Sequence, residues 1–226
     1  MRSRFRTMAG KVTPKKYALV FKGAQYIDTG IDHLGDLEIS VDFQLAVDHG
    51  ADYNTVFGTH GAYYYQNRFT FAKIPASEPN AAYRQMFLAV YGHSNYSDGW
   101  QYMYRIVAPY NTSRNTIRMR KGDEIEFNGA GLQPIAPQQQ PQAPLNIYLG
   151  AVNNQLAPPS MYYIGNMFGC RMKRDGVLVR DMIPVPAGDT RYSATPAPSN
   201  CLWDMVSKAY FENKGTGAFG IEEVTV

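Results

Sequence analysis

The sequence predicts an all-β protein of short strands joined by many turns. Three observations support this: the composition suits sheets and turns, one segment alternates strictly between apolar and polar residues, and two segments have the pattern of β-hairpins. Among its 226 residues are 17 Tyr, 11 Phe, 20 Gly and 14 Pro. Aromatic side chains suit a pleated sheet, and Gly and Pro favour turns. With 45% hydrophobic and 18% charged residues, the chain can bury a substantial core.

The N-terminal segment, residues 1–16, is expected to be an extended basic arm in front of a domain that spans residues 17–226. The first 27 residues carry seven Lys or Arg, and the first acidic residue is Asp28. No apolar period appears before Tyr17, which argues against a strand or helix there. We expect the arm to bind a partner through its basic residues, which are Arg2, Arg4, Arg6, Lys11, Lys15 and Lys16.

The segment from Leu37 to Val47 has the clearest strand pattern. Apolar residues occupy every second position from Leu37 to Leu45, and polar residues lie between them. Because successive strand residues face opposite sides of a sheet, this pattern predicts a strand with one buried face.

The segment from Ile117 to Phe127 is expected to form a hairpin around residues 121–123. This register places Ile117, Met119, Ile125 and Phe127 on one face. On the other face it pairs Arg118 with Glu126 and Arg120 with Glu124, and opposite charges across a strand pair support the register.

A further hairpin is expected at Asp175-Gly176, a favoured turn dipeptide between the strand-like segments 168–173 and 177–183. By contrast, residues 133–144 are rich in Gln and Pro. Proline has no amide hydrogen to donate to a sheet, so we expect a surface loop there within a single domain.

Several other classes of protein are not expected. Two cysteines, Cys170 and Cys201, are too few for a disulfide framework, and no pair of histidines or cysteines has zinc-ligand spacing. No phosphate-binding or dinucleotide-binding glycine motif is present. We therefore expect no metal and no cofactor, and the lack of a long apolar run predicts no membrane partner.

Four segments together resemble a known family. They are Gly23-Ala24-Gln25-Tyr26-Ile27-Asp28-Thr29-Gly30-Ile31, Asn146-Ile147-Tyr148-Leu149-Gly150-Ala151, the stretch from Asp175 to Pro184, and Leu202-Trp203-Asp204-Met205-Val206 with residues 209–217. In this order they are similar to the concanavalin A-like, laminin G-like domains of bacteriophage virion proteins and some bacterial surface proteins. The similarity covers about residue 17 to the C-terminus.

The resemblance implies a two-sheet antiparallel jelly-roll sandwich in which residues 215–217 turn into a final strand, 218–226. It also implies a non-enzymatic structural protein of a bacteriophage virion, assembled in the host cytoplasm. Such a protein would be a capsid decoration, head-fibre or tail-associated subunit that binds other virion proteins. The alternative is a carbohydrate-binding adhesin that engages the host cell surface, since this architecture has many functions.

Catalysis is not expected. Glycosidases of this fold use paired carboxylates in a Glu-x-Asp-x-(x)-Glu pattern, and retaining ones hold them about 5 to 5.5 Å apart. Glu124 and Glu126 come nearest to that pattern, but the predicted hairpin gives both an arginine partner.

The segment from Tyr91 to Tyr110 is the richest candidate for a glycan site. Aromatic faces stack on sugar rings while polar groups bind hydroxyls, and the residues we assign to this role are Tyr91, Tyr96, Asp98 and Trp100. In the alternative interpretation, Trp100, Tyr102, Tyr104 and Ile106 alternate as the inward face of a strand. Only Tyr91, Tyr96 and Asp98, in the preceding loop, would then remain candidates.

The basic arm allows three interpretations: a solvated terminus, a segment that docks on a neighbouring virion subunit, and a contact with nucleic acid. We expect docking, and nucleic acid is the least favoured partner. Arginine and lysine on a flexible segment serve either acidic partner, so salt dependence and partner identity separate the two.

Overall fold

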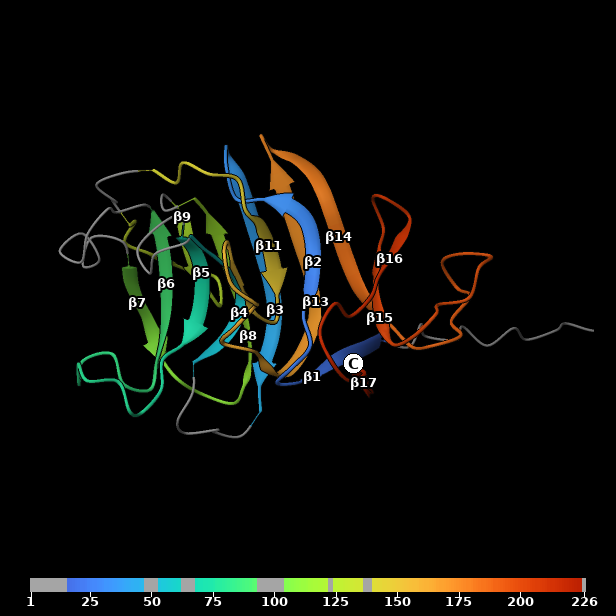
Figure 1. Ribbon diagram of the computed structural model, residues 1–226, viewed down its shortest axis with the longest axis horizontal. Helices are drawn as coiled ribbons and strands as arrows, with labels where there is room; N and C mark the ends of the chain where they lie inside the picture. The colour runs from blue at the N-terminus through green and yellow to red at the C-terminus, as the bar shows by residue number, and fades with distance from the viewer. Residues whose placement is uncertain are drawn as a thin grey trace, which may run out of the picture.

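The computed structural model describes residues 16–46, 53–61, 68–92, 104–121, 124–135 and 140–224. These residues form strands and no helix (Figure 1). The strands are β1 (Lys16–Lys22), β2 (Ile27–Asp32), β3 (Leu37–Leu45), β4 (Asn54–His60), β5 (Arg68–Lys73), β6 (Met86–Gly92), β7 (Tyr104–Pro109), β8 (Arg114–Arg120), β9 (Glu124–Phe127), β10 (Ala130–Leu132), β11 (Asn146–Leu149), β12 (Val152–Asn154), β13 (Ile164–Arg174), β14 (Val177–Val185), β15 (Cys201–Asp204), β16 (Ala209–Phe211) and β17 (Gly220–Val224).

Two sheets face each other, as the predicted sandwich requires. In the described part of the chain, sheet A has ten strands in the order β10-β9-β8-β3-β13-β14-β15-β16, and β1 joins β13 and β17. Sheet B has seven strands in the order β2-β11-β4-β5-β6-β7, with β12 beside β4. All of these pairings are antiparallel except β12 with β4. The fold is an all-β jelly-roll sandwich.

The core lies between the sheets and is rich in phenylalanine. The alternation predicted for residues 37–45 is confirmed, because the apolar residues of β3 are buried and its polar residues are not fully buried. Phe43 meets Phe71 and Phe87 of sheet B edge-on, with ring centroids 5.6 and 5.7 Å apart. Such aromatic contacts add about 0.5–1.5 kcal/mol each beyond the burial of area.

Both predicted hairpins are confirmed. Strands β8 and β9 pair Arg118 with Glu126 and Arg120 with Glu124, as expected. Strands β13 and β14 turn at Asp175 and Gly176, whose φ angles of 52° and 77° define a type I′ turn. Gln133–Ile135 and residues 140–144 form no strand. The final strand begins at Gly220, two residues later than expected, and is described as far as Val224, with residues 225–226 outside the described ranges.

Two features of β13 interrupt regular pairing in sheet A. A bulge between Met167 and Gly169 interrupts its pairing with β3. On the opposite edge of β13, β1 pairs with residues 164–167, while β14 pairs with residues 170–174. Strands β1 and β14 therefore share one edge of β13 and separate beside the bulge.

Candidate functional site

Most residues of the sequence-predicted sites fall outside the described ranges. These residues are Arg2, Arg4, Arg6, Lys11 and Lys15 of the arm and Tyr96, Asp98 and Trp100 of the aromatic segment. Lys16 is described, and it is the exposed first residue of β1, paired with Val224. The arm and aromatic-segment assignments therefore remain predictions.

Tyr91 requires a correction. We expected it in a loop, but it lies in β6 with only 4% of its surface exposed, and its ring packs edge-on against Phe69 in the core. Its hydroxyl donates a hydrogen bond to Oε1 of Gln140, 2.8 Å away. A ring held in this way has no open face for a sugar.

Tyr104 and Ile106 were expected on the inward face of a strand, but they do not face the main core. The two side chains do share a face, but they pack with Leu88 and Val90 in a small cluster. Leu88 and Val90 alternate along β6 with residues of the main core, so this cluster covers the outer face of sheet B. Tyr104 also exchanges a hydrogen bond with the hydroxyl of Tyr83.

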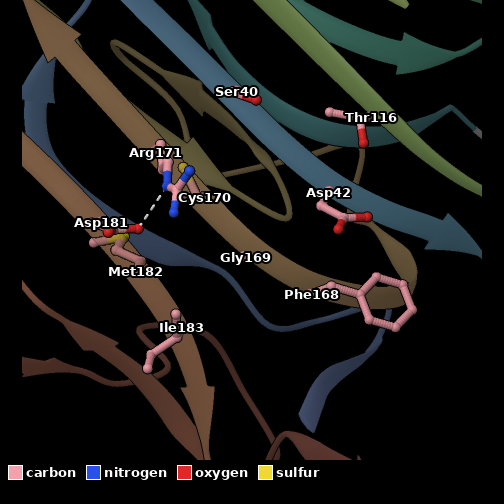
Figure 2. Close-up of a pocket in the computed structure, with 10 residues that line it drawn as sticks. All are labelled: Ser40, Asp42, Thr116, Phe168, Gly169, Cys170, Arg171, Asp181, Met182 and Ile183. Carbon is pink, nitrogen blue, oxygen red and sulfur yellow. Dashed lines mark hydrogen bonds and ion pairs between the residues drawn. The ribbon is translucent and has the colours of Figure 1, made fainter. Parts of the chain in front are cut away.

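One hollow in the described part of the chain lies on the outer face of sheet A, and we call it the bulge groove (Figure 2). It has a volume of about 320 Å³ and is formed by β3, β8, β13 and β14. Its lining residues are Ser40, Asp42, Thr116, Phe168, Gly169, Cys170, Arg171, Asp181, Met182 and Ile183. A volume of this size lies within the range of small-molecule sites.

The bulge in β13, and the separation of β1 and β14 beside it, lie at this groove. The bulge leaves Phe168 without a partner on β3, and Figure 2 shows its ring at one end of the groove. Bulges commonly redirect a side chain in this way. The floor beside Phe168 is Gly169, where an added Cβ would lie 3.2 Å from the carbonyl oxygen of Met182.

A register shift in the β13–β14 pairing places opposite charges next to each other on these two strands. Direct continuation from the Asp175-Gly176 turn would pair Arg171 with Arg180, and like charges opposite each other destabilise a strand pair. A shift in register between Met172 and Lys173 pairs Arg171 with Asp181 instead. Nε of Arg171 then lies 3.0 Å from Oδ1 of Asp181.

A second ion pair lies at the Phe168 end. Nε of Arg114 donates to Oδ1 of Asp42 at 2.9 Å, and its guanidinium lies 4.0 Å from the centre of the Phe168 ring. The hydrogen bond to Asp42 raises the pKa of Arg114. The groove thus combines two carboxylates held by arginines, two hydroxyl groups and an aromatic ring. Such groups can bind sugar hydroxyls and stack on a sugar ring.

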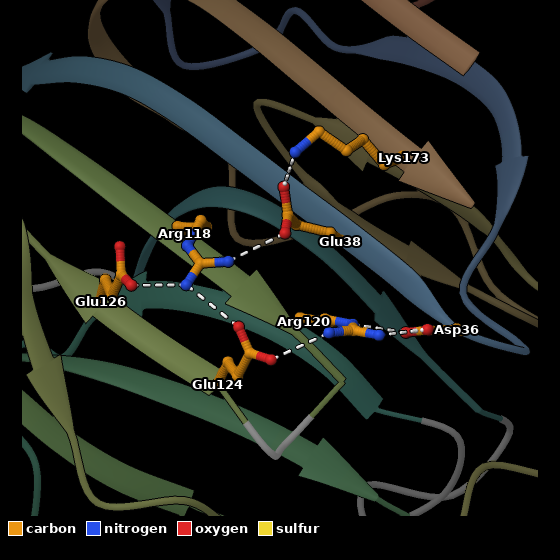
Figure 3. Close-up of polar contacts among 7 residues, drawn as sticks. All are labelled: Asp36, Glu38, Arg118, Arg120, Glu124, Glu126 and Lys173. Atoms are coloured by element: carbon orange, nitrogen blue, oxygen red, sulfur yellow. Dashed lines mark hydrogen bonds and ion pairs between the residues drawn. The ribbon is translucent and has the colours of Figure 1, made fainter. Parts of the chain in front are cut away.

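Glu124 and Glu126 belong to a separate charge ladder on the same face of sheet A (Figure 3). Arg118 contacts Glu126 at 2.5 Å and Glu124 at 3.1 Å, while Arg120 bridges Glu124 and Asp36. The hydrogen bond from Arg118 lowers the pKa of Glu126. A glycosidase acid needs a raised pKa, so this environment opposes that role.

The described ranges also lack a metal cluster and a membrane-spanning helix. Those residues hold no group of three or more His, Cys, Asp or Glu placed to share a metal ion. They also contain no helix that is long and apolar enough to cross a membrane.

Fold and groove together define a β-sandwich protein with a polar and aromatic hollow on one sheet. No model of a known protein family matches the chain, and no curated protein sequence matches it. A solved structure of a candidate carbohydrate-binding protein from Bacteroides ovatus ATCC 8483 is similar, with a TM-score of 0.57 and 14% identity. The alignment covers 95% of this chain and 61% of that one, so the chain spans about three fifths of its length. The likeness supports the fold.

Proposed function

We propose that this chain is a non-enzymatic carbohydrate-binding module that holds glycans in the bulge groove. The observation that supports this most directly is the placing of Asp42 and Asp181 on opposite sides of the groove, with Phe168 at one end. Each carboxylate is held by an arginine, so it is fixed in place as a hydrogen-bond acceptor before a ligand arrives. Preorganised groups cost less to order on binding.

The comparison supports the same class of function only by analogy, because the structurally similar protein is a candidate carbohydrate binder and 14% identity establishes fold alone. Within our proposal, the module works as an adhesin that engages surface glycans. This places the carbohydrate-binding alternative ahead of a purely structural role.

Replacing Asp181 with asparagine is expected to weaken glycan binding about tenfold, because a charge-assisted hydrogen bond to a hydroxyl is lost. Glycans are first selected on an array, and affinity is then measured by calorimetry for the wild type and for Asp181→Asn. The matched control is Glu126→Gln, which changes a carboxylate on the same sheet face outside the groove. Equal affinity in all three proteins would contradict the site, and an array with no bound glycan would contradict the function.

Incubation of the protein with polysaccharides tests the non-enzymatic part of the proposal. The wild type is expected to release no new reducing ends from a panel of polysaccharides. Turnover that disappears in Glu124→Gln or Glu126→Gln would show that the charge ladder is catalytic.

We further propose that the module is carried on a bacteriophage particle. This rests on the resemblance of the four sequence segments and on the basic residues that precede Tyr17. Mass spectrometry of purified particles is expected to find the protein in a fixed ratio to the major capsid or tail proteins. Its absence from particles that are otherwise complete would reject this location.

A further inference from the structure

A second hollow continues the bulge groove toward the start of β1. It has a volume of about 330 Å³ and shares Phe168 and Ile183 with the groove. Its other walls include Tyr17 at the start of β1 and Tyr192 in the segment after β14. Because they share these two lining residues, the two hollows are neighbouring compartments.

The aromatic walls of the second compartment are held in place by their neighbours. The guanidinium of Arg191 lies 5.1 Å from the ring centre of Tyr17 and 5.3 Å from that of Tyr192. Tyr192 also stacks against Trp203, which belongs to a small buried cluster. Rigid aromatic rings give contact area with little loss of conformational entropy, as sugar stacking requires.

The two compartments differ in charge. The bulge groove is lined by two carboxylates, Asp42 and Asp181, and one cation, Arg171. Among the described residues that line the second compartment are two cations, Lys16 and Arg114, and no carboxylate.

Lys16 is the cation that remains for a ligand. Arg114 is occupied by Asp42 at the boundary between the compartments. Lys16 is exposed, and no ion pair joins it to another residue in the described part of the chain. An ammonium group beside aromatic walls suits a sugar that carries a carboxylate.

We propose that the combined groove binds an acidic oligosaccharide, with a neutral sugar in the bulge groove and an adjacent uronic acid in the second compartment. This inference rests on the proposed function and specifies its ligand class. The hydroxyls of the neutral sugar bind Asp42 and Asp181, and the uronate carboxylate binds the ammonium group of Lys16. A chain of at least two residues is needed to reach both.

The test uses a hyaluronan tetrasaccharide, in which uronic acid and N-acetylhexosamine alternate, and the same tetrasaccharide with its carboxylates reduced to hydroxymethyl groups. The acidic form is expected to bind about fivefold more tightly at low salt, the upper range for an exposed ion pair. Lys16→Gln is expected to remove this difference without weakening the reduced form. Lys22→Gln is the matched control, because Lys22 lies at the far end of β1 and lines neither compartment.

The outcomes distinguish a failure of the acidic preference from a failure of glycan binding itself. If both forms bind equally to the wild type and Asp181→Asn weakens both, the groove binds glycans but the acidic preference is wrong. If Lys22→Gln removes the difference as Lys16→Gln does, the placement of the carboxylate is wrong. If neither form binds and a broad glycan array is also empty, both the inference and the proposed function fail.

Discussion

Replacing Asp204 with alanine is expected to lower the free energy of unfolding by about 3–5 kcal/mol. This carboxylate is fully buried at the end of β15. Its oxygens accept hydrogen bonds from the backbone N–H groups of Asp181, Val206 and Ser207 and from the Ser207 hydroxyl, at 2.6–3.2 Å. Burial alone raises the pKa of Asp204, but these hydrogen bonds outweigh burial and lower it. Alanine would leave three amide donors without an acceptor and Arg180 without its counter-charge, 3.7 Å away.

Urea unfolding of the wild type and Asp204→Ala measures this effect. The control is Asp181→Ala on the neighbouring strand, whose carboxylate pairs with an Arg171 side chain that is 70% exposed. An exposed pair contributes about 1 kcal/mol or less, so this variant should remain close to the wild type. Equal losses in the two variants would show that burial of Asp204 is not what stabilises the turn after β15.

Acidification from pH 7.5 to 5 is expected to lower the free energy of unfolding by at least about 2 kcal/mol. The cause is two buried histidines, His60 and His33. Burial, with a further contribution from Arg68, lowers the pKa of His60 to about 4, and burial also lowers the pKa of His33. In the unfolded chain both titrate near pH 6.5. As the pH falls below about 6.5, the unfolded state gains protons that the folded state does not, so stability falls.

The contribution of His60 is fully present above about pH 6.5 and is lost by about pH 4, a total of about 3 kcal/mol. Carboxylates with lowered pKa values, including Asp204, affect stability at lower pH, so measurements between pH 7.5 and 5 report mainly the histidines. His60→Asn keeps a side-chain donor for the carbonyl oxygen of Gly61, which Nδ1 approaches at 2.9 Å. This variant should lose less free energy of unfolding between pH 7.5 and 5 than the wild type. A wild type that is equally stable at both pH values would contradict the account.

The strand pairs that depend on local pattern were predictable from sequence. In the β8–β9 hairpin, the alternation of apolar residues and the pairing of opposite charges favour the same register. Arg118 was therefore correctly placed opposite Glu126. The β13–β14 turn was predictable because Asp-Gly adopts the positive φ angles that a two-residue hairpin needs. These signals act over a few residues and do not require knowledge of the fold.

The bulge groove was not predictable in the same way. It depends on where β13 departs from regular pairing. This is determined jointly by β14, which follows β13 directly, and by β1 and β3, which lie far upstream in the sequence. One local signal existed: regular pairing of the hairpin would have opposed Arg171 and Arg180, so a bulge was favourable. Nothing local indicated that Phe168 would be the redirected residue.

Tyr91 was predicted wrongly because the composition of its surroundings was used to assign it to a loop. A tyrosine beside Gly92 and a polar segment suggested a loop, but six of the seven residues of β6 are buried. Strand β6 lies between β5 and β7, one of its faces packs in the main core, and the other packs in the outer cluster. Tertiary packing of this kind overrides local propensity.

The most direct test of glycan binding in the bulge groove is a titration of isotope-labelled protein with a glycan selected on the array, followed by backbone amide NMR shifts. The account predicts that the largest shifts occur at residues 168–171 and 181–183, and that Asp181→Asn needs about tenfold more glycan to saturate them. Saturable shifts centred on the outer face of sheet B, around Leu88 and Tyr104, would contradict it.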